Sequence, residues 1–238
     1  DASLIQFSDG SNMLVDCGPD KVVLSKLGKY LPFYNRTIDY LVISHFDLDH
    51  YGGCIDVLKR YKVKNIITNG MQKNNDKYWR EWDKFKNKEQ AKEIIINNQI
   101  NWKIAKTNLE FLSPHINLDL PADVNNRSVV FRLIKKDLTI LFTGDIEEPS
   151  EKALLEFYCK TSITNCSALK AKVLKVAHHG SDSSSIKEFL QAVSPKKAII
   201  SVGKNSFGHP SLRVLRRLTR QGIDILRTDI LSDIIIKE

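Results

Sequence analysis

Ser44-His45-Phe46-Asp47-Leu48-Asp49-His50-Tyr51-Gly52-Gly53 directly follows the apolar run Tyr40-Leu41-Val42-Ile43, and this junction decides the fold. The apolar run indicates a buried strand. Two imidazoles and two carboxylates then fall between His45 and His50, a ligand set that suits Zn, Mn or Fe. The glycine pair permits a positive φ and a close backbone approach where the chain enters a helix, expected over 53–61. We therefore expect a metal site beyond this strand. The alternative is a loop whose carboxylates cap the helix and whose histidines are structural.

Length and composition indicate one globular unit. The 238 residues are predicted to form a single domain over 1–238, with a Lys-rich variable segment at about 70–100. Apolar runs are too short to cross a bilayer, so we expect a soluble chain without direct membrane insertion. The sequence is already strand-like at Asp1, which suggests a piece of a longer protein.

The cysteines show neither CxxC nor zinc-ribbon spacing. They are Cys17, Cys54, Cys159 and Cys166. In a chain of this length we expect single thiols that pack as small apolar side chains, and no requirement for an oxidising compartment.

The net charge is +8, and it is unevenly spread. Thirteen Lys and Arg residues lie between Lys59 and Lys106, opposed by five acidic residues. A basic surface attracts phosphate polymers. The alternative is a solvated helix surface with no partner.

Segment 74–93 is polar and Lys-rich, and it carries four aromatic residues at helical spacing. These are Tyr78, Trp79, Trp82 and Phe85. The stripe indicates either core packing of a helix or a stacking platform for single-stranded nucleic acid.

Four further apolar runs are followed by Asp or His, residue types that bind metals and take part in catalysis. The run 13–15 ends at Asp16, 138–142 leads to Asp145, 172–177 to His178-His179-Gly180-Ser181, and 198–202 to His209. Polar groups beyond strand ends gather at one edge of layered α/β folds. Ser181 and Ser183 place hydroxyls at a helix entrance, where anions bind. The alternation of strands and helices in both halves suggests two sheets face to face, with helices outside.

At this point a family resemblance is plain. His45-x-Asp47-x-Asp49-His50 is similar to the HxHxDH signature of the metallo-β-lactamase superfamily, with Asp47 in place of the second His. With Leu14-Val15-Asp16, Thr143-Gly144-Asp145, His178-His179-Gly180-Ser181 and Gly208-His209-Pro210, the chain resembles the hydrolase domain of ComEC-type DNA-internalisation competence proteins. The resemblance implies an α/β fold, the four-layer αβ/βα metallo-β-lactamase sandwich, with a dinuclear metal site.

The resemblance also implies a role for each candidate residue. His45 and Asp47 would hold metal one, Asp49 and His50 metal two, with Asp145 bridging and His178 favoured over His179 and His209 as the remaining ligand. Asp49, His179 and His209 are the catalytic candidates, Ser181, Ser183 and Asn126 the phosphate-binding candidates, and Asp16 a support behind the ligands.

One departure from the family pattern concerns metal one. The superfamily usually supplies a third His where this chain has Asn125-Asn126-Arg127-Ser128. More oxygen and fewer nitrogen donors shift preference from Zn²⁺ toward Mn²⁺ or Mg²⁺. Two ions sharing a carboxylate would lower the pKa of a bridging water toward ~7 and neutralise charge on a phosphoryl oxygen.

The resemblance and the basic charge together predict a metal-dependent phosphodiesterase, a nuclease that acts on single-stranded DNA during DNA uptake. The expected partners are DNA and an upstream membrane-channel region of a longer protein, so that the domain would be tethered to a bacterial cell membrane. One alternative is a small-molecule ester or phosphoester hydrolase of the same fold, phosphorylcholine-esterase-like or lactonase-like. Another is a non-catalytic nucleic-acid-binding module with a degraded metal site.

Overall fold

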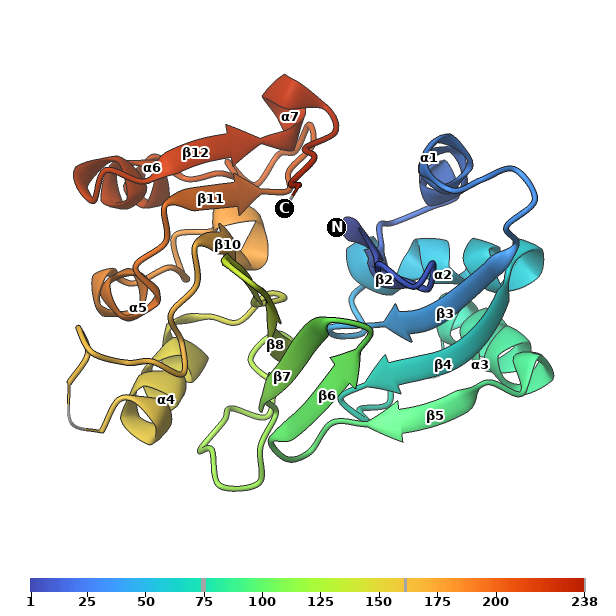
Figure 1. Ribbon diagram of the computed structural model, residues 1–238, viewed down its shortest axis with the longest axis horizontal. Helices are drawn as coiled ribbons and strands as arrows, with labels where there is room; N and C mark the ends of the chain where they lie inside the picture. The colour runs from blue at the N-terminus through green and yellow to red at the C-terminus, as the bar shows by residue number, and fades with distance from the viewer. Residues whose placement is uncertain (74–75, 161, 238) are drawn as a thin grey trace. The chain divides into compact units, whose positions relative to one another are not determined.

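The computed structural model of the chain (Figure 1) describes residues 1–73, 76–160 and 162–237. These residues divide into two compact units, 1–96 and 97–238, each with its own sheet. The expectation of a single domain over 1–238 stays a prediction.

The first unit alternates strands and helices after an opening hairpin. Its elements are β1 (Ala2–Gln6), β2 (Asn12–Cys17), α1 (Val22–Tyr30), β3 (Thr37–Val42), α2 (Leu48–Arg60), β4 (Lys62–Thr68), α3 (Lys77–Glu89) and β5 (Lys92–Ile95). The strand order is β1-β2-β3-β4-β5, antiparallel between β1 and β2 and parallel beyond. Leu14, Leu41 and Ile66 are register neighbours on one face of this sheet, and they pack against Leu27 of α1 and Val57 of α2. This core fixes the start of α2 beside the end of β3.

The second unit begins with an antiparallel meander and continues with parallel strands. Its elements are β6 (Ile100–Ile104), β7 (Thr107–Ser113), β8 (Val130–Lys135), β9 (Leu138–Phe142), α4 (Glu148–Tyr158), β10 (Val173–Lys175), the 3₁₀ turn η1 (Ala177–Gly180), α5 (Lys187–Val193), β11 (Lys197–Ile200), α6 (Leu212–Arg220), β12 (Asp224–Arg227) and α7 (Thr228–Leu231). The strand order is β12-β11-β10-β9-β8-β7-β6.

Helices α4, α5 and α6 bury their apolar sides against this second sheet. Leu154, Leu190 and Leu218, one from each helix, join Leu141 and Ile200 of the strands in one core. Because β9, β10 and β11 are parallel, their carboxyl ends lie at the same edge of the sheet. The segments that follow them begin at that edge, and they carry Asp145, the two adjacent histidines and His209.

Helix α2 begins earlier than the sequence suggested. It starts at Leu48, so Asp49 and His50 lie in its first turn and Gly52 and Gly53 lie inside it. The expected positive φ at the glycine pair is therefore wrong, while the close approach is confirmed. A Cβ on Gly52 would stand 2.5 Å from the carbonyl oxygen of Pro19, and Gly53 N donates to Gly18 O at 2.8 Å. Only glycine lets α2 lie this close to the loop after β2.

The cysteine expectation is wrong. Cys17 bonds to Cys54 and Cys159 bonds to Cys166, leaving no free thiol among the described residues. The first bridge joins the end of β2 to α2 across 37 residues of sequence, and the second closes a loop of 7 after α4. The spacing of the cysteines in the sequence did not reveal either pair, because the partners come together only in the fold.

The apolar residues Ile234, Ile235 and Ile236 near the end of the chain do not form a strand. These residues have no regular structure, and Ile235 is exposed. The chain instead turns into α7 directly after β12, so β12 is the edge strand of its sheet.

The aromatic stripe of segment 74–93 packs mainly in the core; residues 74–75 lie outside the described part of the chain. Trp82 is buried, Trp79 and Phe85 are partly buried against the same core, and Tyr78 is exposed. Several lysines of the basic region form ion pairs, such as Lys59 with Glu81 at 2.7 Å and Lys64 with Asp39 at 2.7 Å. Core packing of α3 thus accounts for most of the stripe.

Within the described ranges, each helix is too short or too polar to span a membrane.

Candidate metal centre

The first group of candidate ligands lies at the junction of β3 and α2. His45 and His50 are completely buried, and their ring centroids are 4.1 Å apart. The backbone of Asp47 is extended, and its carbonyl accepts from His50 N at 2.8 Å, which starts the helix. The side chain of Asp47 makes no capping hydrogen bond, so the alternative of a helix-capping loop is not what the structure shows at Asp47.

Asp16, at the end of β2, anchors this junction. Its Oδ2 lies 2.9 Å from Nδ1 of His50 and accepts the hydroxyl of Ser44 at 2.8 Å, while Oδ1 accepts Ser44 N at 2.8 Å. Since a carboxylate only accepts, the proton of His50 lies on Nδ1 and its Nε2 carries the lone pair. Asp16 therefore fixes both the tautomer and the direction of a ligand-type histidine, as the carboxylates behind metal ligands do.

The position of Asp16 is energetically unfavourable in two ways, in its backbone conformation and in the burial of its charge. Its φ of 56° lies in the left-handed region, which is unusual for a residue other than glycine. Burial acts to raise the pKa of Asp16, but the nearby imidazoles of His50 and His45 and the hydrogen bond from Ser44 N hold it below its usual value. The surrounding bonds thus keep a charged carboxylate inside the protein.

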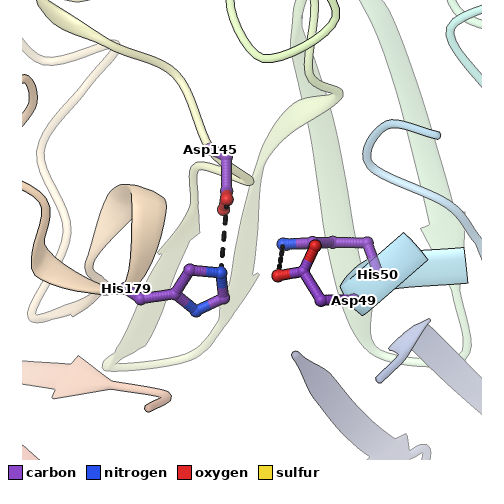
Figure 2. A group of neighbouring side chains, drawn as sticks. All are labelled: Asp49, His50, Asp145 and His179. Atoms are coloured by element: carbon purple, nitrogen blue, oxygen red, sulfur yellow. Dashed lines mark ion pairs between the residues drawn. The ribbon is translucent and has the colours of Figure 1, made fainter. Parts of the chain in front are cut away.

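Asp49 and His50 form the outward part of the first group. Oδ2 of Asp49 lies 3.6 Å from Nε2 of His50, one of the two dashed pairs in Figure 2. The carboxylate is half exposed, whereas the imidazole is buried. Oxygen and nitrogen both present lone pairs here, an arrangement that suits a cation.

Asp47 is engaged differently. Its Oδ1 accepts the ammonium of Lys73 at 2.7 Å, and its Oδ2 lies 3.9 Å from Nε2 of His45. No local pattern pointed to Lys73, because it lies 26 residues from Asp47 in a polar stretch. In this structure the expected pair for metal one includes a carboxylate that already has a cationic partner.

The second group of candidates lies beyond β9. Asp145 is nearly fully buried, and its backbone N donates to the hydroxyl of Ser128 at 3.1 Å. The preceding Thr143 donates its hydroxyl to Lys175 O in β10 at 2.6 Å, and Gly144 O accepts His178 N at 3.3 Å. The strand end is thereby tied to the histidine turn, which sets Asp145 opposite it.

His179 pairs with Asp145. Both His178 and His179 have positive φ, 49° and 52°, inside η1, and this turn points neighbouring rings in different directions. Nδ1 of His179 lies 2.9 Å from Ser201 O, so it carries the proton and leaves the lone pair on Nε2. That Nε2 lies 3.4 Å from Oδ2 of Asp145, the other pair in Figure 2.

His178, the favoured ligand from sequence, pairs elsewhere. Its Nδ1 lies 3.1 Å from Oε1 of Glu147 and 3.4 Å from the hydroxyl of Ser183. Ser183 also donates to Glu147 at 2.9 Å, and the hydroxyls of Ser181 and Ser183 are 3.0 Å apart. The two serines expected to bind phosphate therefore belong to one hydrogen-bonded group around Glu147, which the sequence did not single out.

His209 stands next to both histidines. Its ring centroid is 5.7 Å from that of His178. Burial and the neighbouring His178 and His179 lower the pKa of His209, so the ring is uncharged at neutral pH.

Asn126 serves the backbone in this structure. Its Nδ2 donates to Asp123, its Oδ1 accepts Glu147 N at 3.1 Å, and its carbonyl accepts the Ser150 hydroxyl at 2.8 Å. The side chain that was expected to bind phosphate thus ties the loop before β8 to the start of α4.

Comparisons with known proteins place these groups in a family context. Residues 1–204 match the family model described as Metallo-beta-lactamase superfamily. The chain is 33% identical over 195 residues to ComE operon protein 3 of Bacillus subtilis (strain 168), covering 82% of this chain and 24% of that protein. It is 32% identical over 196 residues to Competence protein ComA of Neisseria gonorrhoeae, with the same two coverages. The chain thus spans about a quarter of the length of these relatives.

A solved structure shares the fold. The metallo-beta-lactamase fold protein YhfI from Bacillus subtilis superposes with a TM-score of 0.59 over 95% of this chain and 87% of its own, at 16% identity.

Proposed function

Because the chain belongs to the metallo-β-lactamase superfamily of metal-dependent hydrolases, we propose that it is a phosphodiesterase that cuts single-stranded DNA during DNA uptake. The proposal assigns metal ligands to each group: Asp49 and His50 in the first unit, and Asp145 and His179 in the second.

One observation carries the proposal: in each group a histidine is anchored through Nδ1 and presents Nε2 beside a carboxylate. Asp16 anchors His50, and Ser201 O anchors His179. Nε2 then stands 3.6 Å from Asp49 in one group and 3.4 Å from Asp145 in the other. Paired lone-pair donors with fixed tautomers fit a divalent cation. On this basis His179 takes the ligand role for which the sequence favoured His178.

The donor types suit more than one metal. The carboxylate and imidazole of each group can bind Zn²⁺, Mn²⁺ or Fe²⁺, and the order of affinity alone does not choose among them. The second ion expected at His45 and Asp47 would have to displace the Lys73 ammonium from Asp47. We therefore propose one tight and one weaker metal position, with Mn²⁺ favoured at the weaker, oxygen-rich one.

When bound, the ions would supply an activated water and neutralise charge on the phosphoryl group. The chain's own residues then hold the substrate. The uncharged ring of His209 can accept a hydrogen bond or a proton, and the Glu147 group keeps His178 and the hydroxyls of Ser181 and Ser183 in one place. These residues position a phosphodiester and form no covalent bond to it.

DNA is the proposed substrate for two reasons. The net charge of +8 favours a polyanion. One relative is named Competence protein ComA, and it is similar to this chain over 82% of the chain's length.

The test is cleavage of a labelled single-stranded oligonucleotide with Mn²⁺ or Zn²⁺. Wild-type protein should cut it, and Asp49→Ala should not. Asp56→Ala is the matched control, because Asp56 lies on the same helix and pairs with Lys59 at 3.5 Å. Equal, residual activity in wild type and Asp49→Ala would refute the proposal.

A further inference from the structure

We propose that Phe207 is a stacking platform for an unpaired nucleobase and so selects single-stranded over duplex substrate; the proposal rests on the function proposed above. Phe207 lies in the loop between β11 and α6, and 80% of its side chain is exposed. Its ring is nearly parallel to that of His209, with an interplanar angle of 19° and centroids 5.9 Å apart. The aromatic ring thus stands beside a catalytic candidate.

The loop that carries Phe207 is organised by one side chain. Nδ2 of Asn205 donates to Gly203 O at 2.9 Å and to His209 O at 2.8 Å. Oδ1 of Asn205 accepts Phe207 N at 3.1 Å and His209 N at 3.0 Å. A single amide therefore fastens the loop on both sides of Phe207, which reduces the entropy lost when a ligand binds there.

The same loop is fastened to the histidine turn. Ser211 N donates to Gly180 O at 2.9 Å, and a Cβ on Gly180 would stand 2.7 Å from Cβ of Pro210. The position of Phe207 is consequently coupled to that of His179, which pairs with Asp145.

Single exposed apolar residues are common on protein surfaces, so exposure alone says little. Here the ring is held on a bonded loop and lies nearly parallel to a histidine ring, and the exposed Lys204 precedes it by three residues in the same loop. An aromatic face next to a cation is how proteins bind single strands, with the base on the ring and the phosphate on the charge. Bases of a duplex stack on each other, so only an unpaired base can use this ring.

The experiment compares variants at Phe207 in binding to fluorescent oligonucleotides of equal length, with Ca²⁺ in place of a catalytic metal. The oligonucleotides are a single strand with bases and an abasic strand with the same phosphates. Phe207→Ala should bind the base-bearing strand roughly 10-fold more weakly than wild type, and the abasic strand equally well. Phe207→Trp should retain wild-type affinity. Phe207→Leu, apolar but without a π face, should behave like Phe207→Ala.

Two results with Phe207→Ala would overturn the inference. One is equal affinity of wild type and Phe207→Ala for the base-bearing strand; the other is equal loss on both strands, which would indicate a loop defect or a general contact. A Phe207→Leu variant that binds the base-bearing strand as tightly as wild type would also overturn the inference, because the contact would then need no aromatic ring. Cleavage of the abasic strand with Mn²⁺ is scored separately: its absence in wild type would refute the proposed phosphodiesterase, while the binding comparison still decides the role of Phe207.

Discussion

The two groups of candidate ligands are built in opposite ways. In the first unit, His45 and His50 are fully buried, and a buried carboxylate, Asp16, fixes the tautomer and direction of His50. In the second, the histidines are partly exposed, and His179 is anchored by the backbone carbonyl of Ser201. A disulfide between Cys17 and Cys54 further ties the first group together.

The difference in burial indicates different roles: the first group stabilises its unit and holds metal, and the second group meets the substrate. The first group is part of the core of its unit, so its residues contribute to stability as well as to metal affinity. The second group lies at strand ends and in a turn, where side chains can meet a substrate. Changes in the first group should therefore lower stability and metal binding together, and changes in the second should lower activity with little loss of stability.

The largest expected effect is on activity, in the second group. Asp145→Asn should reduce cleavage of single-stranded DNA about 1000-fold, because the amide replaces a charged ligand at the metal centre. The melting temperature of the metal-free variant should stay close to wild type. Asp137→Asn, in an exposed turn of the same unit, is the control and should keep full activity. An Asp145→Asn variant with more than about a tenth of wild-type activity contradicts the role given to this residue.

The next largest expected effect is on the stability and metal affinity of the first group. Asp16→Ala should lower the free energy of unfolding of metal-free protein by about 3 kcal/mol, since His50 and Ser44 lose their buried acceptor. Metal affinity, measured by titration calorimetry, should fall by about 10- to 100-fold.

Asp39→Ala is the control for Asp16→Ala. Asp39 accepts from Asn12 N and Lys64 in the same unit, away from the histidines. It should lose stability without losing metal affinity, and an equal drop in affinity would show that the effect is not specific to Asp16.

The two disulfides sharpen the comparison. The double variant Cys17→Ser, Cys54→Ser should lose about 4 kcal/mol of unfolding free energy, and Cys159→Ser, Cys166→Ser about 2 kcal/mol, because the closed loops span 37 and 7 residues. Only the first pair joins the strand of Asp16 to the helix of His50. Urea unfolding measures the loss of stability in both variants. Metal titration should show reduced metal affinity for the first variant alone, and reduced affinity in both would show that the Cys17–Cys54 bridge has no special role in metal binding.

The smallest expected effect is a pH dependence in the second unit. Burial raises the pKa of Glu151 to about 8, against hydrogen bonds from Ile186 N and Ser185 N. Since the folded protein favours the protonated form, this contribution to stability is fully present below the ordinary value of 4.5 and is lost as pH rises through about 8.

Glu151→Gln should therefore reduce the fall of unfolding free energy with rising pH by about 1 kcal/mol per pH unit between these values. Glu156→Gln, exposed on the same helix, should leave the slope unchanged. Urea unfolding at several pH values measures both, and identical slopes for wild type and Glu151→Gln would exclude this assignment.

The family, the α/β fold class and most strand ends were predictable from the sequence. Apolar runs followed by His or Asp have a local signal, so Asp16 was placed correctly at the end of β2, and Asp145 and His209 in the segments that follow β9 and β11. The start of α2 was missed, because Asp and His occur both in loops and in the first turn of a helix.

Other features depend on the fold and left no local trace. Neighbouring His178 and His179 are chemically identical, and only the left-handed turn decides which ring meets Asp145. Lys73 reaches Asp47 from 26 residues away. The cysteine pairs and the Glu147 group likewise arise from chain segments brought together by packing.

The most direct test is a crystal structure of Mn²⁺-loaded protein with an anomalous-scattering map. We expect manganese bound by Asp49 and His50 in the first unit and by Asp145 and His179 in the second, with His178 still paired with Glu147. Manganese bound only by His45 and Asp47, or bound without Asp145, would contradict these ligand roles.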